Sequence, residues 1–177
     1  MKLCIVDTNV ILAANSAHPD LSDECVASCI SELYELKVGG IVVIDDGYRI
    51  LSEYQNKTNS KKGKGPGDVF LKWLLQNNAN IKRCHQVSIT EYEDNKYSEF
   101  PVPALEEAFD APDRKFAAVA NAHSKKPPIL QAADCKWLDW YGDLEKAGIQ
   151  VNFICRTDVL RFYQKKFPHK QRPQVHE

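Results

Sequence analysis

The sequence has no excess of either charge and no long hydrophobic run, and each absence excludes a class of protein. Its 23 basic and 24 acidic residues leave a net charge of -1, so any binding of nucleic acid must come from local basic patches. No apolar run approaches the roughly 20 residues that cross a bilayer. The apolar stretch at the N-terminus is too short for a signal peptide and ends at Asp7. We therefore expect a cytoplasmic protein with no membrane partner.

A cysteine pattern with two short-spaced pairs, typical of zinc sites, is also absent. The six cysteines stand at positions 4, 25, 29, 84, 135 and 155, scattered through apolar segments. Cys25 and Cys29 share one face of a predicted helix, but a zinc site needs two more ligands at suitable spacing. We expect the cysteines to be reduced and mostly buried, as small hydrophobic side chains.

The length and composition are those of one globular domain. The chain has 177 residues, of which 44% are hydrophobic and 27% charged, enough for one buried core. It shows no internal repeat. We expect a single domain over residues 1–168 and a flexible tail over residues 169–177.

Continuous apolar runs predict strands, and helical spacing of apolar residues predicts helices between them. Strands are expected at residues 3–6, 41–44, 81–89, 129–133 and 149–155. Helices are expected at 22–36, from Asp45 or Asp46 past Tyr54, from Asp68 to 74, at 105–109, 113–123 and 137–147, and from Thr157 or Asp158 to 167. Residues 56–67 and 90–103 are predicted to be irregular. Apolar strands that alternate with helices predict a three-layer α/β/α fold with a mainly parallel central sheet.

Four acidic residues occupy places that this fold would bring to one edge of the sheet. Asp7 follows the first strand, and Asp134 follows the strand at 129–133. Asp113 opens the helix that leads into the latter strand, and Glu53 lies in the helix after residues 41–44. Open parallel sheets place their sites at the carboxyl ends of the strands. We expect the four carboxylates to gather there.

Gathered carboxylates repel one another, and a divalent cation removes that repulsion. Mg²⁺ and Mn²⁺ prefer oxygen ligands, and a cation held in this way can activate water and stabilise charge on a phosphodiester. Each acid also has a simpler interpretation. Asp7 and Glu53 can be solvated charges, Asp113 a favourable charge at a helix start, and Asp134 a helix cap. The functional interpretation therefore depends on the four acids together.

Four segments resemble the PIN-domain family of metal-dependent ribonucleases. The segment Val6-Asp7-Thr8-Asn9-Val10-Ile11-Leu12 is similar to its opening signature, in which a hydrophobic strand, Asp-Thr-Asn and an apolar helix follow one another. The segments at 50–54, 113–120 and 129–134 are similar to those that carry its other acids. The resemblance spans nearly the whole chain.

The resemblance implies a PIN-like fold, metal-dependent hydrolysis of RNA, and Asp7, Glu53, Asp113 and Asp134 as ligands of Mg²⁺ or Mn²⁺. Thr8 and Asn9 would support the site through hydrogen bonds. The family often has Thr or Ser at the position of Ala132 and a further acid at that of Lys136, for which Asp139 can substitute. Family precedent also suggests a homodimer, and a toxin with an antitoxin partner or a defence nuclease as the biological role.

Basic residues near the acids are candidates for binding the RNA backbone. They are Lys57, Lys61, Lys62 and Lys64 in the loop, and Arg114, Lys115 and Lys136 beside the acids. The loop lysines can equally serve solubility alone. Trp137, Trp140 and Tyr141 can stack on the bases of single-stranded RNA, although their helical spacing is more typical of a core.

Two other functions are compatible with the sequence. A phosphatase of the haloacid-dehalogenase type also begins with an aspartate at a strand end, but its chemistry needs a second aspartate where Asn9 stands. A catalytically weak PIN-like module that binds RNA or a protein is favoured by Ala132 and Lys136. A covalent aspartyl-phosphate would distinguish the phosphatase. Nuclease assays with Mn²⁺ that compare the native chain with Asp7→Asn distinguish the nuclease from the binding module.

Overall fold

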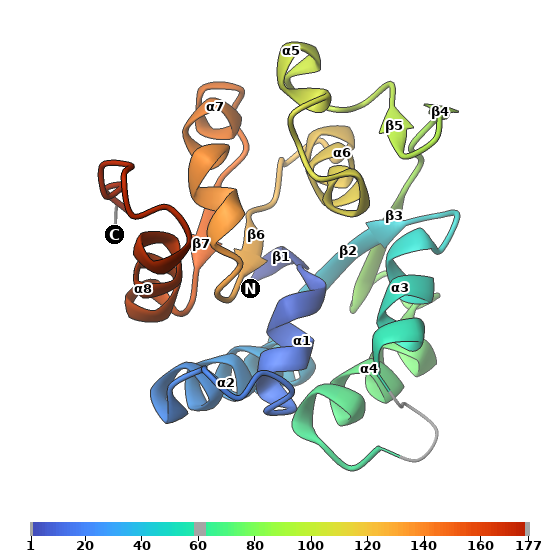
Figure 1. Cartoon of the computed structure of the whole chain (residues 1–177). Coiled ribbons are helices and arrows are strands. Elements are labelled where there is room, and N and C mark those ends of the chain that lie inside the picture. The colour runs from blue at the N-terminus through green and yellow to red at the C-terminus, as the bar shows by residue number, and fades with distance from the viewer. Residues whose placement is uncertain (1, 59–62, 176–177) are drawn as a thin grey trace.

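A sheet of five parallel strands forms the centre of the computed structural model, which describes residues 2–58 and 63–175 (Figure 1). The strand order is β3-β2-β1-β6-β7, and each neighbouring pair is parallel. The strands are β1 (Leu3–Val6), β2 (Ile41–Asp45), β3 (Cys84–Val87), β6 (Ile129–Gln131) and β7 (Val151–Phe153). The predicted α/β class with a mainly parallel central sheet is confirmed.

Helices cover both faces of the sheet and complete the three layers (Figure 1). On one face α1 (Thr8–Ala14), α2 (Asp23–Gly39) and α4 (Pro66–Asn77) pack against one another, and on the other α6 (Arg114–Ala122) contacts β1, β2 and β6. The remaining helices are α3 (Arg49–Lys57), α5 (Pro103–Glu106), α7 (Tyr141–Lys146) and α8 (Arg156–Lys166), with short 3₁₀ turns η1 (Ala111–Asp113) and η2 (Cys135–Asp139).

The apolar character of the strands follows from this cover, because strands enclosed on both faces present no side to water. Every residue of β2 is buried, Asp45 at its end included. On α6, Phe116, Ala117, Val119 and Ala120 are buried. Their mostly small side chains allow α6 to lie close to the central strands.

The structure corrects several predicted boundaries. Residues 90–103 are not wholly irregular, because they contain the hairpin β4 (Glu91–Glu93) and β5 (Lys96–Tyr97). Asn95 between them has a φ of 54°, a left-handed conformation that asparagine tolerates well. The predicted helix at 137–147 is divided into η2 and α7, and β6 and β7 are shorter than expected. The helix expected from Asp113 begins at Arg114, after η1.

Three predicted helix caps are wrong, although two of the acids still bind the helix starts. Tyr48 and Gly65 are the N-caps of α3 and α4. Asp45 accepts hydrogen bonds from the backbone N–H groups of Arg49 and Ile50, at 2.8 and 2.9 Å. Asp68 lies inside α4 and accepts from the N–H of Gly65. These acids therefore satisfy free N–H groups of the first turns from beside the cap positions.

The third wrong cap concerns α8, which begins after Cys155 without a side-chain cap. Neither Thr157 nor Asp158 takes that role. Asp158 accepts instead from the backbone and hydroxyl of Ser22 and from Arg161. It thereby joins the start of α8 to the start of α2, where Ser22 is the N-cap.

The cysteines are all buried as predicted, but they are not all reduced. Cys25 of α2 forms a disulfide with Cys155, 130 residues further along the chain. The Cys29 sulfur lies 3.7 Å from that of Cys155. The carboxyl end of β7 brings Cys155 over the face of α2 that carries Cys25 and Cys29, a proximity that sequence spacing does not reveal.

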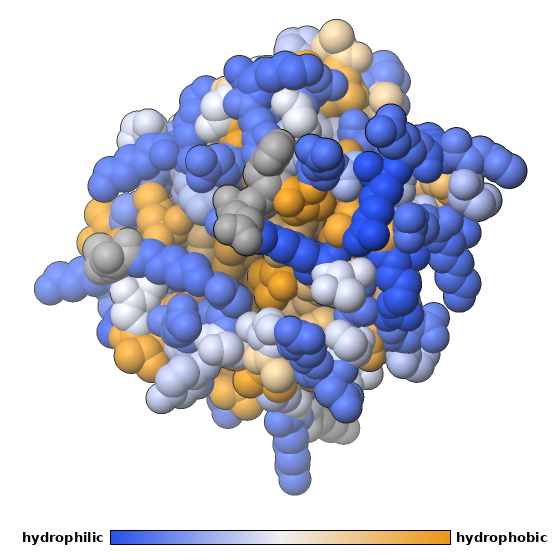
Figure 2. All heavy atoms as spheres, turned by 90° about the vertical axis from the view of Figure 1, so that its left-hand side faces the viewer, coloured by the Kyte–Doolittle hydropathy of each residue, from blue (hydrophilic) through white to orange (hydrophobic). Residues whose placement is uncertain are grey.

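The face that carries α7 and α8 is mainly hydrophilic, with hydrophobic areas between its charged side chains (Figure 2). The segment that follows α8 is described as far as Val175 and contains no helix or strand. Tyr141 donates to the carbonyl of Gln174, and Lys170 forms an ion pair with Asp139. No helix in the described part of the chain has both the length and the apolar character needed to cross a membrane.

Candidate active site

The strand order places a topological switch between β1 and β6. The chain runs from β1 to β2 and β3 on one side, and β6 and β7 lie on the other. Ligands of open parallel sheets bind outside the carboxyl ends of the strands at such a switch. Asp7 directly follows β1, and Asp134 lies three residues beyond the end of β6. Both predicted acids therefore lie at the edge of the sheet where a site is expected.

Asp7 is almost completely withdrawn from solvent, with 3% of its surface exposed. It is the N-cap of α1, and its Oδ1 accepts from the N–H of Asn9 at 2.9 Å. Its Oδ2 is buried and has no hydrogen-bond partner among the described residues. A buried carboxylate oxygen without a donor is costly, so Asp7 requires either a proton or a cation beside it.

Asn9 connects the two central strands at this edge. Its Oδ1 accepts from the backbone N–H of Ala132 at 2.9 Å, so the start of α1 is joined to the segment after β6. Asp134 itself accepts from the N–H of Lys136 at 3.0 Å and is the N-cap of η2. The capping interpretation of Asp134 is therefore confirmed, and only one of its oxygens is used for it.

Glu53 of α3 is held on two sides. The hydroxyl of Thr8 donates to Oε1, and the ammonium of Lys115 donates to Oε2. The exposed fractions of the Lys115 and Glu53 side chains are 7% and 19%. The predicted support from Thr8 is thus present, and it acts on Glu53. Lys115 neutralises a carboxylate that would otherwise add to the repulsion at the site.

Asp113 lies at the end of η1, directly before α6. Its backbone N–H donates to the carbonyl of Asp110, which closes the 3₁₀ turn. Asp110 brings a fifth carboxylate close to the site and forms an ion pair with Lys136. The sequence prediction missed Asp110, although its position three residues before Asp113 in one turn is a usable signal.

The pKa values show that the acids act on one another. Burial and the charges of Asp113, Asp134 and Glu53 raise the pKa of Asp7 well above its usual value. Burial and the charges of Asp134, Asp110 and Glu53 raise the pKa of Asp113 to about 7, while Lys115 acts in the opposite direction. The four predicted carboxyl groups thus form one electrostatic cluster around Asp7.

The cluster fits a hard divalent cation by charge and by donor type. In the described part of the chain, however, only Cys25, Cys29 and Cys155 form a group of three metal-ligand side chains whose ligand atoms all lie within 4.8 Å of one another. The acids are therefore spaced more widely than a closed protein cage requires. Mg²⁺ tolerates such spacing, because it is usually bound through one or two carboxylates and retains several waters. The unpartnered oxygen of Asp7 is the first ligand to consider.

Asp139 is separate from this cluster. It accepts from the hydroxyl of Tyr163 at 2.6 Å and pairs with Lys170 at 2.9 Å. Its charge is not among the main causes of the raised pKa of Asp7 or Asp113. Asp110 therefore fits better than Asp139 the expected role of a further acid beside the site.

The three basic residues beside the acids that were predicted to bind RNA are engaged within the protein. Arg114 is buried and donates to the carbonyl of Phe109. Lys115 and Lys136 pair with Glu53 and Asp110. Lys57 and Lys64 are exposed, and Lys61 and Lys62 lie outside the described residues. Trp137 and Trp140 are buried in an aromatic group with Phe109, as the core interpretation predicts.

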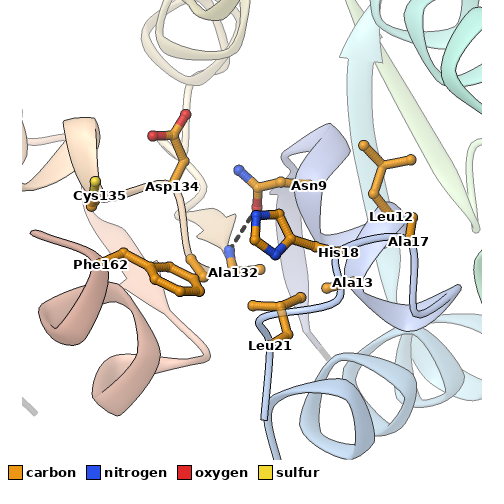
Figure 3. Close-up of a pocket in the computed structure, with 11 residues that line it drawn as sticks. Asn9, Leu12, Ala13, Ala17, His18, Leu21, Ala132, Asp134, Cys135 and Phe162 are labelled. Carbon is orange, nitrogen blue, oxygen red and sulfur yellow. Dashed lines mark hydrogen bonds between the residues drawn. The ribbon is translucent and has the colours of Figure 1, made fainter. Parts of the chain in front are cut away.

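A cavity of about 380 Å³ adjoins the acids (Figure 3). Asn9 and Asp134 line it together with side chains that are mostly apolar. A second hollow of about 430 Å³ lies beside Glu53 and includes Lys57, Arg49 and Lys115. Each hollow is thus lined by one of the four acids, Asp134 in the mostly apolar cavity and Glu53 in the charged one.

Comparison with protein-family models, with curated proteins and with solved structures finds no match to this chain.

Proposed function

We propose that this protein is a divalent-metal-dependent ribonuclease in which Asp7, Glu53, Asp113 and Asp134 hold Mg²⁺ or Mn²⁺. The proposal rests most directly on Asp7, whose buried Oδ2 has no partner in the described part of the chain while three other acids raise its pKa. RNA is proposed as the substrate because four segments around these acids resemble the PIN-domain family. The proposed substrate is single-stranded.

The chain's own residues set the geometry of the site. Asn9 links the segment after β1 to that after β6 and so holds Asp7 in a fixed place relative to Asp134. Thr8 and Lys115 orient the Glu53 carboxylate. When bound, the cation would lower the pKa of water and stabilise negative charge on the phosphodiester. The exposed Lys57, beside Glu53, can attract the phosphate backbone.

The test is cleavage of a single-stranded RNA by the full chain in Mn²⁺, compared with Asp7→Asn. Because loss of groups that only support a metal ligand already lowers activity by 10- to 100-fold, we expect Asp7→Asn to lose roughly 100-fold or more. Asp23→Asn is the matched control, since Asp23 is an exposed acid at the start of α2. Equal cleavage by the native chain and Asp7→Asn contradicts the proposal.

A second readout does not depend on turnover. Binding of Mn²⁺ by the native chain is measured by electron paramagnetic resonance and compared with Asp7→Asn and Asp23→Asn. We expect binding to be lost in Asp7→Asn alone. Mn²⁺ binding without cleavage would support the proposed metal site and contradict the proposed nuclease activity.

One observation favours a second candidate, a module that binds RNA or protein without cleavage. Lys115 already neutralises Glu53 in the absence of metal, so one of the four proposed ligands has a partner of its own. RNA bound by both the native chain and Asp7→Asn, with cleavage by neither, is the result that this candidate predicts. A homodimer and an antitoxin partner belong to the same family precedent, and the mass of the purified protein in solution tests the homodimer.

A further inference from the structure

The cavity beside Asp134 is enclosed by segments from three parts of the chain. α1 contributes Asn9 and Leu12, the loop before α2 contributes His18 and Leu21, and α8 contributes Phe162. Ala132 lies between them (Figure 3). The volume of the cavity, about 380 Å³, is within the range of pockets that bind small organic ligands. Asn9 and Asp134 belong to this wall and to the acid site, so the two sites are contiguous.

Two aromatic rings form part of the wall of this cavity. The ring centroids of His18 and Phe162 lie 5.5 Å apart, with an angle of 44° between the planes. In Figure 3 both rings are turned toward Ala132, with Leu21 below them. A planar group that enters the cavity would contact these rings and the aliphatic side chains around them.

The polar groups at the cavity offer hydrogen-bond donors. The Nδ1 of His18 accepts from the backbone N–H of Asp20 at 3.3 Å, which leaves the proton of the neutral ring on Nε2. Asn9 uses its Oδ1 for Ala132, and its Nδ2 has no acceptor among the described residues. An apolar cavity with a few convergent polar groups binds ligands that are both flat and polar at their edges.

The segments that carry the rings of His18 and Phe162 are joined by contacts outside the cavity. Cys25 lies four residues after Leu21, and its disulfide to Cys155 ties the start of α2 to the start of α8. Ser22 donates two hydrogen bonds to Asp158, and Arg161 donates to the carbonyl of Asp20. These links hold the loop with His18 against the helix with Phe162, so the cavity is formed before a ligand arrives.

We propose that this cavity binds one unpaired nucleobase of the RNA, beside the phosphodiester held at the acids. The inference rests on the proposed function, which places RNA at Asp7 and Asp134. A base has the flat shape that the rings favour and edge acceptors for the donors of Asn9 and His18. An apolar peptide side chain would fill the apolar part of the cavity but would leave those donors without partners.

The test measures how strongly a short RNA binds when single bases are removed. Hexamers of adenosine, each with one abasic residue at a different position, are titrated against the native chain in Ca²⁺, a cation with oxygen ligands that is used in place of Mg²⁺ and Mn²⁺ to hold the RNA without cleavage. One stacked base contributes enough that its loss weakens binding by about fivefold or more. We expect binding to weaken when the base is missing at one position of the hexamer. When Phe162→Ala is introduced, we expect a missing base at that position to have no effect on binding.

Two further variants separate the cavity from general effects on folding. His18→Ala changes an exposed loop residue, so it tests the same wall without a loss of core packing. Phe167→Ala removes an aromatic residue that follows α8 and lies outside the cavity lining. The weaker binding of a hexamer with a missing base is called the abasic effect. We expect His18→Ala to reduce the abasic effect and Phe167→Ala to leave it unchanged.

The outcomes distinguish failure of this inference from failure of the proposed function. Cleavage by the native chain with no abasic effect at any position overturns the base site and leaves the nuclease. An abasic effect that depends on Phe162, without cleavage in Mn²⁺, supports the base site in a protein that only binds RNA. An abasic effect of the same size in Phe162→Ala, or no binding of the hexamers, overturns the inference. If Phe162→Ala does not change the affinity for RNA, the cavity does not bind a base, and a peptide becomes the candidate occupant.

Discussion

Lys115 and Glu53 form an ion pair at the edge of the acid cluster, and both side chains are largely withdrawn from water. Lys115 comes from the start of α6 and Glu53 from α3, so the pair joins helices that lie on either side of the site. Lys115 also donates to the carbonyl of Pro112. It therefore holds the turn that carries Asp113 close to Glu53.

The first prediction concerns this pair. Lys115→Gln removes the charge that opposes repulsion between Glu53 and Asp113, and it leaves Glu53 buried without a cation. Because breaking a buried pair is strongly destabilising, we expect the free energy of unfolding without metal to fall by about 3 kcal/mol. Urea denaturation measures it. Lys146→Gln is the control, because Lys146 pairs with Asp143 at the exposed surface, and we expect no measurable change there.

The second prediction is a pH dependence of the metal-free protein. Asp7 and Asp113 have raised pKa values in the folded state, about 7 for Asp113. A carboxyl group with a raised pKa binds its proton more tightly when folded, so its favourable contribution is present at low pH and is lost as the pH rises toward 7. We expect Asp113→Asn to unfold at a higher temperature than the native chain at pH 8, and the difference to shrink at pH 5.

Thermal unfolding at several pH values in the presence of a chelator checks this prediction. A lower melting temperature of Asp113→Asn at pH 8 would contradict it. Added Mn²⁺ should reverse the order, since it stabilises only the chain that retains its ligands.

The third prediction concerns the disulfide. Cys25–Cys155 closes a long segment of the chain, with a sequence separation of 130, and thereby restricts the unfolded state. We expect Cys25→Ser to lower the free energy of unfolding by about 2–4 kcal/mol in the absence of a reductant. Dithiothreitol should reduce the stability of the native chain to a similar extent and should have little effect on Cys25→Ser.

Cys29→Ser is the matched control for the disulfide, because Cys29 is buried beside the bond but does not take part in it. A loss in Cys29→Ser as large as that in Cys25→Ser would indicate that packing, and not the bond, accounts for the effect.

The fourth prediction tests the close contact of α4 with α1. A Cβ atom at Gly67 would lie 2.3 Å from the carbonyl oxygen of Ile11, so α4 must move in Gly67→Ala. We expect a loss of about 1–3 kcal/mol. At Gly142 in α7 nothing lies within 4 Å of an added Cβ, and Gly142→Ala should stabilise the protein by about 0.5–1 kcal/mol. Equal effects of the two variants would contradict this account of the packing.

Much of the fold could be predicted because its central strands are buried on both faces. Such strands are apolar along their whole length, and residues 41–44 show this without interruption. The hairpin at residues 91–97 gave no such signal, since β4 is exposed throughout. The end of β7 was also obscure, because the apolar run continues through Ile154 to Cys155, although β7 ends at Phe153 and Cys155 is the N-cap of α8.

The positions of the four acids followed from the order of strands and helices, but their partners did not. Lys115 stands beside Arg114 in the sequence, and nothing in the spacing shows that one pairs with Glu53 while the other is buried against Phe109. The pairing of Cys25 with Cys155 likewise depends on the packing of α2 beneath β7. Such long-range contacts are decided by the tertiary structure, which local patterns do not encode.

The most direct test of the central claim is the position of Mn²⁺ in crystals of the native protein, measured by anomalous diffraction. The account predicts a peak beside the Oδ2 of Asp7, within reach of the other three carboxylates, and its absence in Asp7→Asn. A peak only at the surface, or none at all at millimolar Mn²⁺, would contradict it.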